Sequence, residues 1–172
     1  MITLALSLTL AGPMLVQDSD PLAPARAGQV QCAQPDRGRR TCLAMIDHVF
    51  EADGTIRTRT RTVIAPAPLI VLHSESVVTV RGDAVCQTIG GFDDARLTVD
   101  GQPADPAVAG AVLSQIAAAT ASLRGQEACA VAIRTGGVWM TRTTINGQRQ
   151  PELDVVYIWV SPADGYQLAA PG

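Results

Sequence analysis

Four cysteines, Cys32, Cys42, Cys86 and Cys129, place the strongest constraint on how this chain folds. Their number is even, and an even set in an exported protein is typically consumed in disulfides. Four cysteines allow three pairings. We favour Cys32–Cys42, which closes a short loop rich in arginine, proline and glycine, and Cys86–Cys129, which ties two predicted strands on either side of a predicted helix. On the chain-entropy model the two loops contribute roughly 3 and 4 kcal/mol of stability, as upper values.

A zinc site is the alternative use of these cysteines. Zinc ligands usually come in close pairs such as Cys-x-x-Cys, and the sequence has no such pair. His48 and His73 stand at no familiar spacing from any cysteine. We therefore predict no metal site. We also predict no cofactor, because the sequence has no P-loop and no dinucleotide fingerprint.

The first residues resemble an export signal. Residues 2–10 are apolar, residues 11–13 interrupt the run, and residues 14–16 briefly resume it. Such a run is too short for a bilayer-spanning helix, and it has the length of the apolar part of a signal peptide. We expect a signal-peptide-like segment at 1–16, a periplasmic or secreted protein, and no transmembrane span in the mature chain. No basic residue precedes the run, so a buried N-terminal helix stays open as the alternative.

Composition limits the function classes. With 47% hydrophobic residues and a net charge of −3 over 172 residues, the chain can build the core of one ordinary domain. A pI near 5.2 argues against a nucleic-acid binder. All thirteen basic side chains are arginines. Codon bias in a GC-rich genome explains this, and selection for binding phosphate or carboxylate groups is the alternative.

One helix is predicted, at residues 106–124. Asp105 is a suitable N-cap, Pro106 suits the first helical position, and Gly125 suits the residue that follows the end. An apolar stripe at helical spacing gives this segment one face to bury. Its members are Val108, Val112, Leu113, Ile116, Thr120 and Leu123.

Alternating and β-branched runs on both sides of this helix predict strands joined by tight turns. We therefore expect an α+β fold, in which an antiparallel sheet of about six to eight strands carries the helix on one face and disulfides staple the domain. Residues 17–31 are expected to be a flexible lead-in, 32–162 a single domain, and 163–172 a C-terminal tail. The predicted strands are 42–50, 56–64, 69–80, 85–89, 96–99, 128–134, 138–145 and 153–160.

Arg57, Arg59 and Arg61 alternate along one predicted strand and share a face. They form a possible anion-binding stripe for phosphate or carboxylate groups of the cell envelope, or for an acidic partner. The alternative is the solvated face of an ordinary antiparallel strand, which we favour. Three arginines of the first cystine loop would extend the stripe if the fold brings them near: Arg37, Arg39 and Arg40.

Candidate catalytic groups are few. His73 and Glu75 share a face of one strand and would need a nucleophile, and the adjacent Asp93 and Asp94 lack the further oxygen ligands of a calcium loop. His48 lies beside an aspartate on a strand, where neighbours point to opposite faces. Trp139, Tyr157 and Trp159 are expected to be core or cross-strand pairs, not a ligand platform.

Two stretches carry a resemblance. The cystine-loop opening, from Gln31-Cys32 to Thr41-Cys42, and the ending Ile158-Trp159-Val160-Ser161-Pro162-Ala163-Asp164-Gly165-Tyr166 resemble small exported proteins of GC-rich Gram-negative bacteria, an uncharacterised group. The resemblance implies export and no activity.

These observations favour a non-enzymatic exported module that binds an unknown ligand or supports the envelope. An inhibitor or accessory subunit of an envelope enzyme is the first alternative, acting through an exposed, cystine-rigidified loop at residues 32–42. A hydrolase of unknown type is the second. The expected partner is an envelope component or a protein, and not a nucleic acid.

Overall fold

The computed structural model describes residues 20–170, and the signal-like segment predicted at 1–16 lies outside them. The described chain contains twelve strands and two α-helices, α1 (Ala23–Arg26) and α2 (Pro106–Thr120). The strands are β1 (Val30–Asp36), β2 (Thr41–Phe50), β3 (Ile56–Pro66), β4 (Leu69–Arg81), β5 (Ala84–Thr88), β6 (Arg96–Val99), β7 (Gln102–Pro103), β8 (Glu127–Thr135), β9 (Val138–Ile145), β10 (Gln148–Arg149), β11 (Val156–Val160) and β12 (Gln167–Leu168).

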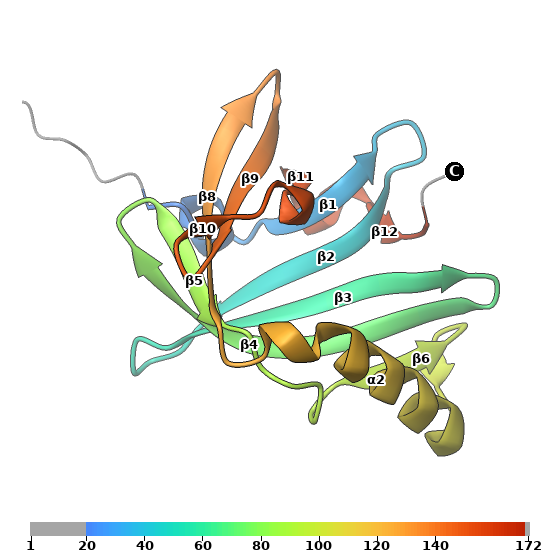
Figure 1. Cartoon of the computed structure of the whole chain (residues 1–172). Coiled ribbons are helices and arrows are strands. Elements are labelled where there is room, and N and C mark those ends of the chain that lie inside the picture. Colours follow the sequence, from blue (N-terminus) through green and yellow to red (C-terminus); the bar gives the residue numbers. More distant parts are fainter. Residues whose placement is uncertain (1–19, 171–172) are drawn as a thin grey trace, which may run out of the picture.

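Eight of these strands close into an antiparallel barrel (Figure 1). They pair in the order β1, β2, β3, β4, β5, β8, β9 and β11, and β11 then pairs with β1. The predicted α+β fold class was therefore wrong: the chain is mostly β, and its sheet closes on itself instead of lying open under a helix. Closure pairs both edges of the sheet, so no separate layer is needed to cover them.

The segment between β5 and β8 is an insertion that contains β6, β7 and α2. The thirteen residues of β4 serve two partners. Its first half, Ile70–His73, pairs with β6, and its second half, Thr79–Arg81, pairs with β5. The insertion therefore extends the sheet beyond the barrel without opening it.

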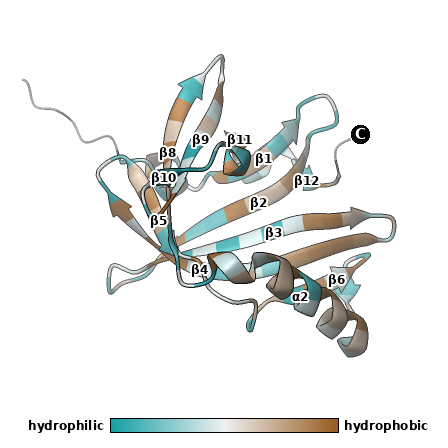
Figure 2. Cartoon of the chain, viewed as in Figure 1, coloured by the Kyte–Doolittle hydropathy of each residue, from teal (hydrophilic) through white to brown (hydrophobic). Residues whose placement is uncertain are grey.

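Helix α2 begins where the sequence predicted, but it does not pack as expected. The Oδ1 atom of Asp105 accepts the N–H groups of Ala107 at 2.9 Å and Val108 at 3.3 Å. The α-helix has 15 residues and no buried residue, and a 3-10 turn follows it. Apolar colouring predominates along it, and residues 106–123 are long and apolar enough to meet the criteria of a membrane span (Figure 2). The predicted packing on one sheet face was wrong because the barrel interior is filled from other segments.

The barrel interior is filled from one end by the residues around α1. Leu22 has no exposed surface, and it packs with Ile56 and Val78 from β3 and β4 and against Trp159 from β11. This element lies within residues 17–31, the segment expected to be a lead-in. It supplies the apolar contacts that hold the interior faces of the strands together.

A second cluster covers the outer face near the chain ends. The Cys32–Cys42 disulfide packs with Ile158 and Val160, and Tyr166 lies against them. Strand β12, in the predicted C-terminal tail, pairs in parallel with the start of β2. Alternate residues of β11 thus serve both clusters, with Trp159 facing the interior cluster and its two neighbours facing the disulfide.

Both disulfides have the pairing that the sequence analysis favoured. Cys32–Cys42 links β1 and β2 across their hairpin. Cys86 and Cys129 stand directly opposite each other in the ladder of β5 and β8. The second bridge therefore joins the two strands at the point where the insertion interrupts the barrel.

Removal of the two disulfides is expected to have unequal effects. The double variant Cys86→Ser/Cys129→Ser opens a loop with a sequence separation of 43, whereas Cys32→Ser/Cys42→Ser opens one of 10. The chain-entropy model then gives losses of about 4 and about 3 kcal/mol in the free energy of unfolding. Urea titrations of both variants measure the difference. Equal losses, or a larger loss for Cys32→Ser/Cys42→Ser, would contradict the prediction that Cys86–Cys129 contributes more to the free energy of unfolding.

Candidate functional site

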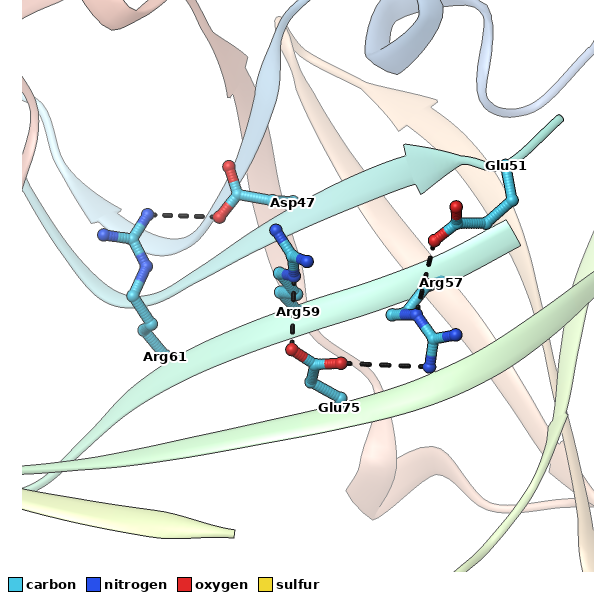
Figure 3. Close-up of polar contacts among 6 residues, drawn as sticks. All are labelled: Asp47, Glu51, Arg57, Arg59, Arg61 and Glu75. Atoms are coloured by element: carbon cyan, nitrogen blue, oxygen red, sulfur yellow. Dashed lines mark hydrogen bonds and ion pairs between the residues drawn. The ribbon is translucent and has the colours of Figure 1, made fainter. Parts of the chain in front are cut away.

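The arginine stripe of β3 is neutralised by carboxylates of β2, of β4 and of the turn between β2 and β3 (Figure 3). Arg61 lies 3.1 Å from Asp47, and Arg59 lies 3.2 Å from Glu75. Arg57 lies 3.4 Å from Glu51 and 3.9 Å from the same Glu75. Exposed pairs of this kind contribute about 0–1 kcal/mol each. The stripe is thus an ion-paired outer surface of the barrel, and β3 is not an edge strand.

The residues considered for hydrolysis are not brought together. The Nε2 atom of His73 lies 3.1 Å from the Thr98 hydroxyl, while Glu75 faces the arginines of β3. Partial burial and the charges of nearby arginines hold the pKa of His73 below its usual range. Asp93 pairs with Arg124 at 3.3 Å. Over residues 20–170, no group of three or more metal-ligating side chains is present.

An open hollow of about 730 Å³ lies where β9 and β11 separate. The ladder between these strands has only two pairs, Val156↔Met140 and Tyr157↔Trp139. Beyond it β9 has one more residue, Val138, before the turn, and the tip of the β8–β9 hairpin projects from the barrel (Figure 1). The residues that line the hollow are Pro24, Gln29, Arg37, Arg40, Arg134, Gly137, Trp139, Ile158, Trp159, Val160, Ala163, Asp164 and Tyr166.

Cations without a carboxylate partner gather at this hollow. Eight of the thirteen arginines have a carboxylate oxygen within 4.0 Å among residues 20–170. Three of the other five, Arg37, Arg40 and Arg134, line the hollow, whereas Arg96 and Arg142 do not. Arg37 donates a hydrogen bond to the Gly137 carbonyl at 2.8 Å and so bridges the tips of the two hairpins. The arginines of the first cystine loop thus meet the β8–β9 hairpin.

Ring side chains lead from the hollow into the barrel. The Arg134 guanidinium lies 5.8 Å from the Trp139 ring centroid, and this ring lies 6.5 Å from Tyr157, tilted by 18°. Tyr157 meets Trp159 edge-on at 5.9 Å, and Trp159 lies 6.2 Å from His48. Burial raises the pKa of Tyr157 to about 12, so the phenol stays neutral. Both tryptophans of the chain therefore belong to this row and line the hollow.

His48 ends the row inside the barrel. Its Nδ1 atom lies 3.1 Å from the hydroxyl of Thr58, and its Nε2 atom is buried without a hydrogen-bond partner within the described part of the chain. Burial lowers the pKa of His48, and the charge of Asp47 opposes this only in part. The imidazole is therefore neutral at pH 7.

This site was not predicted from the sequence. Arg37 and Arg40 were expected only to extend the stripe on β3, and the tryptophans were expected to form core or cross-strand pairs, as Trp139 does with Tyr157. One signal was available: Arg134 and Trp139 flank a Gly-Gly turn symmetrically, so a hairpin register pairs them. The remaining lining residues come from segments that no local pattern connects.

Searches against protein-family models, curated proteins and solved structures found no match to this chain. Function is therefore inferred from the geometry of the hollow.

The two histidines are expected to lower the free energy of unfolding as the pH falls, in a pH range above that of the carboxyl groups. Their folded pKa values lie below 6.5, so the unfolded chain takes up protons first as the pH falls through that value. The free energy of unfolding should decrease as the pH falls from about 7.5 to about 5, and His48→Gln should make this pH dependence weaker. Asp20 and Asp36, whose pKa values are lowered from the 3.8 of a free aspartate, reduce the free energy of unfolding mainly at more acidic pH. Urea titrations across pH check this, with His73→Gln as the matched comparison. An unchanged slope in His48→Gln would contradict it.

Proposed function

We propose that this is an exported, non-catalytic binding protein whose hollow between β9 and β11 takes up an anionic ligand. The observation that carries the proposal is the gathering, in one hollow, of both tryptophans and three arginines that have no carboxylate partner within residues 20–170. Arginine presents a planar fork of N–H donors that matches carboxylate and phosphate groups. Tryptophan supplies flat apolar surface beside it.

The local charge contrasts with the charge of the whole chain. The net charge is −3, yet the hollow has three arginines and one acid, Asp164. The Asp164 carboxylate accepts the N–H of Ser161 at 2.6 Å in a capping box, so part of its hydrogen-bonding capacity is already used. An anion that enters the hollow therefore meets a positive field on a protein that otherwise repels it.

The scaffold favours binding by a pre-formed site. The volume of the hollow falls within the about 300–1,000 Å³ typical of ligand sites. Two hairpins form its rim, and one of them is closed by the Cys32–Cys42 disulfide. A rigid rim loses little conformational entropy when a ligand binds.

Export is proposed on two grounds, the two disulfides and the signal-like sequence of residues 1–16. The disulfides are consistent with an oxidising compartment. We extend this to a periplasmic or secreted protein, in which residues 1–16 serve as the signal.

The β1–β2 hairpin supports a second candidate, the inhibitor or accessory subunit. Its tip, residues 37–40, is exposed, and the disulfide holds its base. Arg39 pairs with Asp36 at 2.7 Å, which stiffens the tip. Because Arg37 and Arg40 of this tip face the hollow, we place the ligand-binding role first.

Intrinsic fluorescence tests the proposed function directly, since the only two tryptophans line the hollow. Citrate and inorganic phosphate are expected to change the emission in a saturable, salt-sensitive way. Arg134→Gln and Arg40→Gln should each weaken binding about tenfold, as expected for loss of a charge-assisted hydrogen bond. Arg142→Gln is the matched control, because Arg142 also lacks a carboxylate partner among residues 20–170 and lies outside the hollow. Equal losses in all three variants, or no response to either anion, would reject the hollow as an anion site.

A further inference from the structure

Strand β9 ends one residue beyond its last pair with β11, so the edge of β11 has no neighbouring strand at the hollow. Strand β11 continues beyond the last β9 pair and stays paired with β1 on its other side through Val160. Strand β9 likewise stays paired with β8 to Val138, next to the turn. The hollow is therefore a slit at this end of the barrel wall, with the main chain of Ile158–Val160 on one side and the turn at Gly137 on the other.

Exposed strand edges accept further strands. The unpaired N–H and C=O groups of an edge form a template for an extended peptide, which gains main-chain hydrogen bonds when it pairs there. Like charges around an edge discourage the wrong partners and select the right ones. Here the rim is positive, since Arg37, Arg40 and Arg134 have no carboxylate partner within residues 20–170.

We propose that the ligand is an extended acidic peptide segment that enters the slit as an added strand, paired with the free edge of β11. This inference rests on the proposed function, and it specifies the ligand class for the same hollow. Aspartate or glutamate side chains at the ends of the segment reach the rim arginines. Apolar or β-branched residues fill its centre.

The side chains around the slit explain why the centre is apolar. Residues of a strand in the wall point alternately inward and outward. Inward neighbours are Trp139 and Trp159, and outward neighbours are Ile158, Val160 and Tyr166. Both faces of an added strand thus meet apolar or aromatic groups in the middle.

The Arg37 side chain closes the slit before binding. Its guanidinium donates to the Gly137 carbonyl at 2.8 Å, from one hairpin tip to the other. An acidic side chain of the peptide replaces this carbonyl as the acceptor and releases the tip of the β1–β2 hairpin from the β8–β9 turn. The exchange conserves the hydrogen bond of Arg37 and replaces a neutral acceptor with a charged one.

Titration with synthetic peptides, followed by tryptophan fluorescence, tests the proposal on the full mature chain. The first peptide alternates valine and threonine between aspartate pairs. The second is identical but N-methylated at alternate central amides, and the third replaces aspartate with lysine. We expect the first to bind about tenfold or more tightly than the second, since N-methylation removes main-chain donors and leaves the charges. Amide exchange should slow at Trp159 when the first peptide is bound.

Charge reversal distinguishes recognition from a structural role. Arg40→Glu should lose the aspartate peptide and gain the lysine peptide, whereas Arg142→Glu should change neither. A variant that is merely misfolded would bind neither peptide, and its far-UV circular dichroism would reveal this.

The outcomes separate the two proposals. Equal binding of the N-methylated peptide, or tighter binding of an acidic polysaccharide such as polygalacturonate, would overturn the added-strand inference while the anion site remains. A response to citrate and phosphate without any response to the peptides would do the same. No response to any of these probes would reject both the inference and the proposed function.

Discussion

The antiparallel ladder between β1 and β11 is the contact on which the barrel depends. It joins the beginning and the end of the described domain through four residue pairs, from Val30↔Val160 to Ala33↔Tyr157. Every other pair of neighbours in the ring is consecutive in the chain, apart from the insertion between β5 and β8 and the short β10 between β9 and β11. Without this ladder the remaining strands form an open meander with two free edges, and the interior cluster around Leu22 loses one of its walls. The hollow exists because β11 forms four residue pairs with β1 but only two with β9.

Local order could be predicted from the sequence, and closure could not. Alternation along residues 56–64 and the cap at Asp105 depend on neighbours in the chain, and both elements begin where they were expected, although α2 ends at Thr120 and not at Arg124. The pairing of Val30 with Val160 joins residues far apart in sequence, and no periodicity carries that information. The apolar stripe of α2 indicated a sheet beneath the helix. In the structure, residues near α1 fill the interior, so the helix has no buried residue.

The same distinction applies to the site. The arginines of β3 are conspicuous because they alternate within one strand, but their partners Asp47 and Glu75 lie on the two adjacent strands. The alternation within one strand shows which charges share a face, but it does not show which carboxylates of the adjacent strands pair with them. The hollow has the opposite character: its arginines are scattered in sequence, and only the meeting of two hairpin tips brings Arg37 and Arg134 to one rim.

The Cys86–Cys129 bridge has an evolutionary consequence. It clamps β5 to β8 where the insertion leaves the barrel and returns to it, and backbone hydrogen bonds of 2.8 Å between Ile89 and its partners Gly125 and Gln126 close the same neck. The ring of eight strands is complete without the segment between them. That segment can lengthen, shrink or be exchanged over evolutionary time at little cost to the ring, so natural variation in size should concentrate there, while the strands that frame the slit keep their lengths.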